Sequence, residues 1–142
     1  MKWIFMSLLF LATSCILLKR AEKKTPSQQV ITNSISGIWY IVSVNNQKVV
    51  KTKAGNETPF LDFSVSEKTL SGSTGCNRIT GKATITNNSI NFGPLATTLM
   101  MCPNAQYERL ILQTLIGNLS YTYEQGIITI TKEGRTIMTL AK

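Results

Sequence analysis

Short stretches of alternating apolar and polar residues, separated by pairs of turn-forming residues, fill most of the chain from residue 36 onward. The clearest stretches are rich in β-branched and aromatic residues and lie at 38–44, 60–65, 127–132 and 136–141. Alternation with period two places the apolar side chains on one face of a strand. The reversals fall at pairs that favour tight turns, Asn45-Asn46, Asn87-Asn88 and Glu133-Gly134. This pattern restricts the chain to a mainly antiparallel β fold.

One segment departs from the β pattern. Residues 104–119 carry apolar side chains at helical spacing, namely Tyr107, Leu110, Ile111, Leu115 and Leu119. Further short strands are expected at 47–50, 68–74, 78–86, 89–92, 95–100 and 120–123, with the Gly93-Pro94 pair as a break. A sheet with one apolar face must bury that face against another element. We therefore expect an α+β, mainly β fold: a curled antiparallel sheet or open barrel of about eight short strands, covered by one amphipathic helix.

The stretch 71–81, SGSTGCNRITG, predicts a sharp and structured turn between two strands. Glycine reaches backbone conformations that other residues avoid, and Asn and Ser side chains bond to nearby backbone groups. Asn77 is expected to hold this turn by bonding backbone groups. Arg78 could bind a carboxylate or phosphate as a planar fork, but an arginine here more often bonds carbonyls or pairs with an acid such as Glu108 or Asp62.

The first residues have the character of a bacterial export leader. Lys2 supplies a charged start, residues 3–11 are apolar, and residues 11–15 (LATSC) are similar to a lipobox, although Ala12 stands where that motif usually has Leu. We expect a lipoprotein signal peptide at 1–14, and a lipidated Cys15 that begins a polar tether reaching residue 35. The alternative is an uncleaved membrane anchor, but residues 3–18 fall short of the roughly twenty apolar residues that span a bilayer.

The three cysteines of the chain divide into one lipidation site and one pair. With Cys15 lipidated, Cys76 and Cys102 remain, and disulfides persist outside the cytoplasm. We predict a structural cross-link that stabilises the domain by about 3–4 kcal/mol. A redox-active pair is the alternative, because active dithiols lie at helix N-termini and Cys102 precedes the expected helix.

Several function classes are disfavoured by composition. The net charge of +8 is concentrated partly in the leader and tether, and the region from residue 36 carries ten basic against six acidic residues without a basic stripe, so no nucleic-acid partner is expected. The chain has no histidine and only one aspartate, Asp62, which removes histidine-based triads and zinc sites. We expect no enzyme activity, no metal and no cofactor. For Met100-Met101, core filling is favoured over lining of a hydrophobic groove.

These motifs together resemble a known family. Residues 37–40, the turn 71–81, residues 95–103 (LATTLMMCP) and Glu108 are similar to the META domain, also called domain of unknown function 306 and typified by the heat-shock lipoprotein HslJ. The resemblance covers 36–142, and the motif residues are Gly75, Cys76, Asn77, Arg78, Thr98, Met100, Cys102 and Pro103. Leu99 departs from the family pattern, which commonly has Arg there. The resemblance implies a small envelope domain of mixed sheet and helix with stress or antibiotic-resistance associations.

The expected function follows from the anchor and the resemblance. We expect a non-enzymatic lipoprotein of the cell envelope that binds an envelope protein or a hydrophobic ligand, or supports the envelope under stress. Ile16 after the lipidated cysteine favours the outer membrane, facing the periplasm. The alternatives are a redox-active protein and an inhibitor-type module that use the region of Cys76 and Cys102.

Overall fold

The computed structural model describes residues 32, 34–50, 57–101 and 106–142. Within them lie β1 (Gly37–Val44), β2 (Gln47–Lys48), β3 (Phe60–Ser64), β4 (Thr69–Ser73), β5 (Arg78–Ile85), β6 (Ser89–Thr97), α2 (Gln106–Thr114), β7 (Gly117–Glu124), β8 (Ile127–Lys132) and β9 (Arg135–Ala141). The strands expected at 38–44, 60–65 and 127–132 are confirmed almost to the residue. The return strand expected at 47–50 is shorter and covers only Gln47–Lys48.

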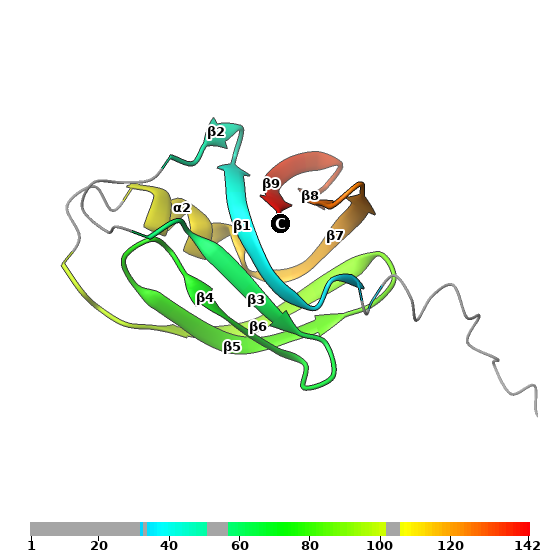
Figure 1. Ribbon diagram of the computed structural model, residues 1–142, viewed down its shortest axis with the longest axis horizontal. Coiled ribbons are helices and arrows are strands. Elements are labelled where there is room, and N and C mark those ends of the chain that lie inside the picture. The colour runs from blue at the N-terminus through cyan, green and yellow to red at the C-terminus, as the bar shows by residue number, and fades with distance from the viewer. Residues whose placement is uncertain (1–31, 33, 51–56, 102–105) are drawn as a thin grey trace, which may run out of the picture.

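The strands form one antiparallel sheet that closes on itself (Figure 1). The order β1-β3-β4-β5-β6-β7-β8-β9 follows the chain, and β9 pairs back onto β1 from Tyr40↔Ala141 to Val44↔Met138. An even number of strands lets the first and last meet antiparallel, so eight strands complete a barrel while β2 extends the sheet from β1. The predicted β-rich fold is confirmed, and its curled sheet is a closed barrel.

The barrel interior is filled by side chains. β3 shows the pattern clearly, because Leu61 and Phe63 are buried while Phe60, Asp62 and Ser64 are partly exposed. An eight-stranded barrel has an interior just wide enough for such side chains. Ile35, just before β1, is fully buried, and its carbonyl accepts a 2.7 Å hydrogen bond from the indole Nε1 of Trp39. The core is therefore a packed cluster of apolar side chains.

The helix α2 is shorter than the predicted 104–119. It lies in the connection between β6 and β7 and buries Ile111 on the barrel, with Leu115 just after its last residue. Leu119, expected on the helix, instead belongs to β7, where Leu119 and Tyr121 are both buried and Gly117 adopts a positive φ of 75°. Leu119 fits a spacing of four after Leu115 and also a spacing of two before Tyr121, so the pattern did not decide between helix and strand. Among the described residues no helix has both the length and the apolar character needed to cross a bilayer.

β6 is one strand where two were expected. Gly93 and Pro94 do not end it; instead the register with β5 shifts there, so that these two residues lie opposite Lys82. Such a bulge bends a strand without ending it. The strand ends at Thr97, and residues 98–101 leave the barrel wall towards α2.

Candidate functional site

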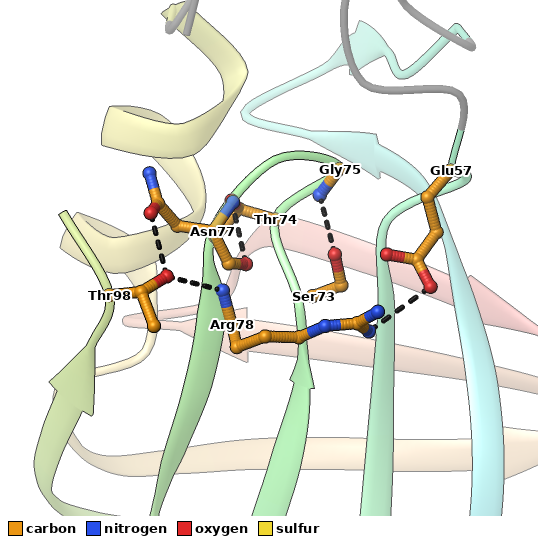
Figure 2. A network of polar contacts seen from close by, with 7 residues as sticks. All are labelled: Glu57, Ser73, Thr74, Gly75, Asn77, Arg78 and Thr98. Carbon is orange, nitrogen blue, oxygen red and sulfur yellow. Dashed lines mark hydrogen bonds and ion pairs between the residues drawn. The ribbon is translucent and has the colours of Figure 1, made fainter. Parts of the chain in front are cut away.

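The turn between β4 and β5 is held by hydrogen bonds among its own residues (Figure 2). The Thr74 hydroxyl accepts from the Asn77 amide at 3.0 Å and lies 3.2 Å from the Asn77 carbonyl, to which the Thr74 amide donates at 2.9 Å. The Gly75 amide donates to the Ser73 hydroxyl at 3.1 Å. Gly75 has a φ of 97°, and a Cβ there would lie 3.1 Å from the Pro59 side chain, so the turn requires glycine.

The side chain of Asn77 is the centre of the site and is only 2% exposed. Its Oδ1 accepts from the Met100 amide and from the Thr98 hydroxyl, both at 2.7 Å. Its Nδ2 donates to the Met100 carbonyl at 3.2 Å and to Glu108 Oε1 at 2.7 Å. An amide side chain has two donors and two acceptor positions, so these four bonds occupy all of them. The Met100 amide can only donate, and this fixes which end of the Asn77 amide is oxygen.

This bonding joins three parts of the chain that are distant in sequence. Asn77 follows β4, Thr98 and Met100 follow β6, and Glu108 lies in the first turn of α2, where a carboxylate is favoured by the helix dipole. The Arg78 amide adds a 3.0 Å bond to the Thr98 hydroxyl. We call this set of residues, Thr74, Asn77, Thr98, Met100 and Glu108, the Asn77 junction. The sequence predicted that Asn77 holds only its own turn. In the structure Asn77 also holds β6 and α2.

Arg78 pairs with neither of the acids that were expected. Its NH1 lies 3.1 Å from Glu57 Oε1, and its guanidinium lies over the Phe60 ring, 5.9 Å from the centroid. The prediction of Glu108 or Asp62 is wrong. Asn77 bonds Glu108, and the Arg78 side chain reaches across β4 to Glu57, which lies just before β3 (Figure 2). Both side chains of the pair are substantially exposed, at 61% and 36%.

The cysteines are only partly described. Cys76 lies half-buried in the turn and its sulfur is disulfide-bonded. Cys15, Cys102 and Pro103 lie outside the described residues, so the pairing of Cys76 with Cys102 and the lipidation of Cys15 stay predictions. Gly75, Asn77, Arg78, Thr98 and Met100 do come together, as the shared motif suggested.

The two methionines were expected in the core, and this was wrong. Met100 is 59% and Met101 fully exposed, and Leu99 before them is 93% exposed. They follow the end of β6, where the chain has left the barrel wall, and the junction holds Met100 through its backbone. The Met100 side chain therefore faces solvent.

The chemistry available at the junction is limited. Every buried side-chain nitrogen and oxygen of the described residues has a hydrogen-bond partner. Across the same residues, no three His, Cys, Asp or Glu side chains gather closely enough to hold a metal ion. Burial raises the pKa of Tyr121, which lies in β7 and donates a 2.8 Å bond to the Thr86 carbonyl, away from the junction. The arrangement positions the backbone that follows β6 and the first turn of α2.

Two hollows on the surface were not foreseen from the sequence. One, of about 710 Å³, is polar and lies between the Asn45-Asn46 turn and the β8–β9 hairpin, where Arg135 and Glu133 lie 3.7 Å apart. The other, of about 550 Å³, is lined by residues of β6 and of the α2–β7 segment. The Gly93-Pro94 pair was the available signal for the second, because both residues line it.

The fold and junction define a small closed antiparallel barrel in which a helix between the sixth and seventh strands is tied to the β4–β5 turn. The sequence model of the META domain matches residues 32–142, so the chain belongs to the META domain family. A comparison with curated proteins finds no match.

Two solved structures are similar to this chain. One, an NMR structure, has a TM-score of 0.62 and 27% identity and covers 78% of this chain and 92% of its own. The other, an NMR structure of a protein from Burkholderia xenovorans, has a TM-score of 0.58 and 20% identity and covers 79% of this chain and 86% of its own. At that lower identity the second likeness concerns the fold alone.

Proposed function

We propose that this META domain protein is a non-enzymatic lipoprotein of the bacterial cell envelope with a binding or structural role under envelope stress or antibiotic challenge. The apolar leader, the small residues before Cys15 and the polar tether after it support a lipid anchor. Ile16 after the anchor favours the outer membrane, with the domain facing the periplasm.

One observation carries the non-catalytic assignment. Asn77, the most polar buried residue of the family motif, uses all four of its hydrogen-bonding positions on Thr98, Met100 and Glu108. A catalytic amide or carboxylate needs a position left for substrate. The motif is therefore explained by the need to hold β6 and α2 in place.

The anchor is tested by labelling cells with radioactive palmitate and separating their membranes. We expect label on the wild-type protein and none on the Cys15→Ala variant, with the wild type in the outer-membrane fraction. Equal labelling of both proteins, or of neither, would contradict the proposed anchor.

The envelope role is tested by deleting the coding sequence and challenging the cells with heat, detergent and large antibiotics such as novobiocin. We expect increased sensitivity that is restored by the wild-type protein and not by the Cys15→Ala variant. An unchanged deletion strain, together with no retention of any envelope component by the purified protein, would contradict this role.

The alternative function would use the disulfide bond of Cys76. A redox-active protein would cycle this bond, whereas a structural cross-link stays oxidised. Alkylation of thiols in growing cells followed by mass spectrometry separates the two: we expect a fully oxidised pair that resists mild reductant. A partly reduced pair would favour redox cycling. Capture of an envelope hydrolase that the protein inhibits would favour an inhibitor-type module.

A further inference from the structure

The second half of β6 has a strand neighbour on one side only. β7 pairs with β6 only at residues 89–92, from Ser89↔Ser120 to Phe92↔Gly117. Beyond that point β5 continues beside β6 as far as Ile79↔Thr97, and no strand of the described residues pairs with the opposite side. The bulge opposite Lys82 turns β6 away from β7 at this place. Residues 93–97 therefore form a strand edge that has no strand neighbour among the described residues.

The register shows which backbone groups this edge presents. The Thr98 amide donates to the Arg78 carbonyl at 3.1 Å, so these residues form a hydrogen-bonded pair. In an antiparallel ladder such pairs recur every second residue, which makes Ala96 with Thr80 the next one. Leu95 and Thr97 have the opposite parity and direct their N–H and C=O groups away from β5. A further strand could take up these groups.

An apolar groove runs along this edge. It has a volume of about 550 Å³ and lies between β6 and the end of α2, and its lining has no charged side chain: Phe92, Gly93, Pro94, Leu95, Thr97, Leu112, Leu115, Ile116 and Gly117. Phe92 and Leu115 are buried, whereas Ile116 on the α2 side is 62% exposed. An exposed apolar wall beside a row of backbone groups suits an extended peptide, which places side chains in the groove and pairs its backbone with the edge.

Two exposed cations lie next to residues that line the groove, and their charge bears on which peptide the groove would bind. Arg109 is exposed and lies one helical turn before Leu112. Lys82 is exposed beside Gly93, where an added Cβ would lie 3.2 Å from the Lys82 Cβ. Glu57 is paired with Arg78, and the Glu108 carboxylate keeps its charge but bonds the neutral amide of Asn77 and is only partly exposed, unlike the two cations. The tether of this chain is itself basic, with Lys19, Arg20, Lys23 and Lys24. Repulsion between like charges therefore disfavours the tether as the segment that occupies the groove. The charges of Arg109 and Lys82 favour a partner with acidic side chains.

We propose that the groove between β6 and α2 binds an extended peptide of alternating apolar residues with acidic residues at its ends, which pairs as an added strand with Leu95 and Thr97. The inference concerns the ligand of the domain and rests on the proposed binding role; that the peptide belongs to an envelope protein rests on the proposed location. A lipid acyl chain would fill the apolar groove but would leave the backbone groups of the edge unpaired.

The test is a selection of peptides from a displayed random library on the mature protein held in detergent micelles, followed by binding measurements. We expect the selected peptides to alternate apolar residues and to carry Asp or Glu. Ile116→Glu should weaken them by about tenfold or more, because it replaces an apolar wall by a negative charge. The matched control is Ile127→Glu, which changes a similarly exposed isoleucine, 44% exposed on β8, and should leave binding unchanged.

Amide hydrogen exchange identifies the mode of binding. In the free protein the Ala96 amide should exchange slowly and those of Leu95 and Thr97 quickly; the peptide should slow both of the latter. Replacing the acidic ends of the peptide by Lys should weaken binding, and Arg109→Glu should restore part of that loss. Slow exchange at Leu95 and Thr97 without peptide, binding that protects neither, or a library that yields no peptide sensitive to Ile116→Glu would overturn the proposal.

Two further outcomes separate peptide binding from self-association and from the proposed lipid anchor. Self-association of the protein that Ile116→Glu abolishes would show that a second copy takes the edge, and would overturn the peptide assignment. Loss of palmitate labelling would remove the proposed anchor but would leave peptide binding measurable, so the two proposals fail independently.

Discussion

The Asn77 junction and the β6–α2 groove both lie where β6 meets α2. They differ in whether their hydrogen-bonding groups have partners. At the junction the buried side chain of Asn77 has all four of its positions bonded. Along the groove the backbone of Leu95 and Thr97 faces a space with no neighbouring strand in the described residues. The family motif thus builds the frame, and the peptide binding that we propose belongs to residues outside the motif.

The largest effect should come from breaking the predicted cross-link between Cys76 and Cys102. Replacing both Cys76 and Cys102 by Ser should lower the free energy of unfolding by about 3–4 kcal/mol, since the loop that the bond closes becomes unconstrained in the unfolded chain. Urea unfolding measures this, with Cys15→Ser as the control that leaves the pair intact. An unchanged midpoint for the double variant would show that the two cysteines are not paired.

Asn77→Ala should have the next largest effect. It leaves the Met100 amide and the Glu108 carboxylate without their buried partner, and we expect a loss of about 2–3 kcal/mol. Asn91→Ala, an exposed asparagine on β6, should change stability by less than about 0.5 kcal/mol. If the two variants lose equal stability, the contrast between junction and surface is wrong. Peptide binding at the groove should persist in the folded fraction of Asn77→Ala.

Tyr121 tests a buried hydrogen bond away from both regions. Tyr121→Phe removes the bond to the Thr86 carbonyl and should cost about 1 kcal/mol in urea unfolding at neutral pH. Burial raises the pKa of Tyr121 above its ordinary value, so the folded state holds this proton more tightly than the unfolded state. That stabilisation is complete below pH of about 10 and is lost as the pH rises through the folded-state pKa. The wild type should therefore lose stability more steeply than Tyr121→Phe above pH of about 10; parallel curves would contradict the assignment.

Much of the barrel was predictable because its signals are local. The alternation in β1 and β8 and the turn pair Glu133-Gly134, whose φ angles are 51° and 76°, are set by neighbouring residues. Closure was not predictable, because it depends on the pairing of Tyr40 with Ala141 across the whole chain. The end of α2 was missed because Leu119 satisfies both periods.

At the site the sequence identified the motif residues and missed most of their partners. Asn77 was recognised as a residue that bonds backbone, but its link to Glu108 requires α2 to lie against the β4–β5 turn. The exposure of Met100 and Met101 depends on where β6 leaves the barrel, which composition does not report. The groove was missed because a free edge appears only when the register of three strands is known.

The smallest effect should come from Arg78, although it belongs to the same motif as Asn77. Its pair with Glu57 is largely exposed, and such pairs are typically worth less than about 1 kcal/mol because water and salt screen them. A double-mutant cycle of Arg78→Ala and Glu57→Ala should therefore give a coupling below about 1 kcal/mol that shrinks as salt is added. Phe60→Leu serves as the control for the contact between Arg78 and the ring. A coupling as large as the loss in Asn77→Ala would mean that membership of the motif decides the energetics. A small coupling energy would mean that burial decides the energetics. The bonded junction, rather than the motif as a whole, would then hold β6 and α2 together.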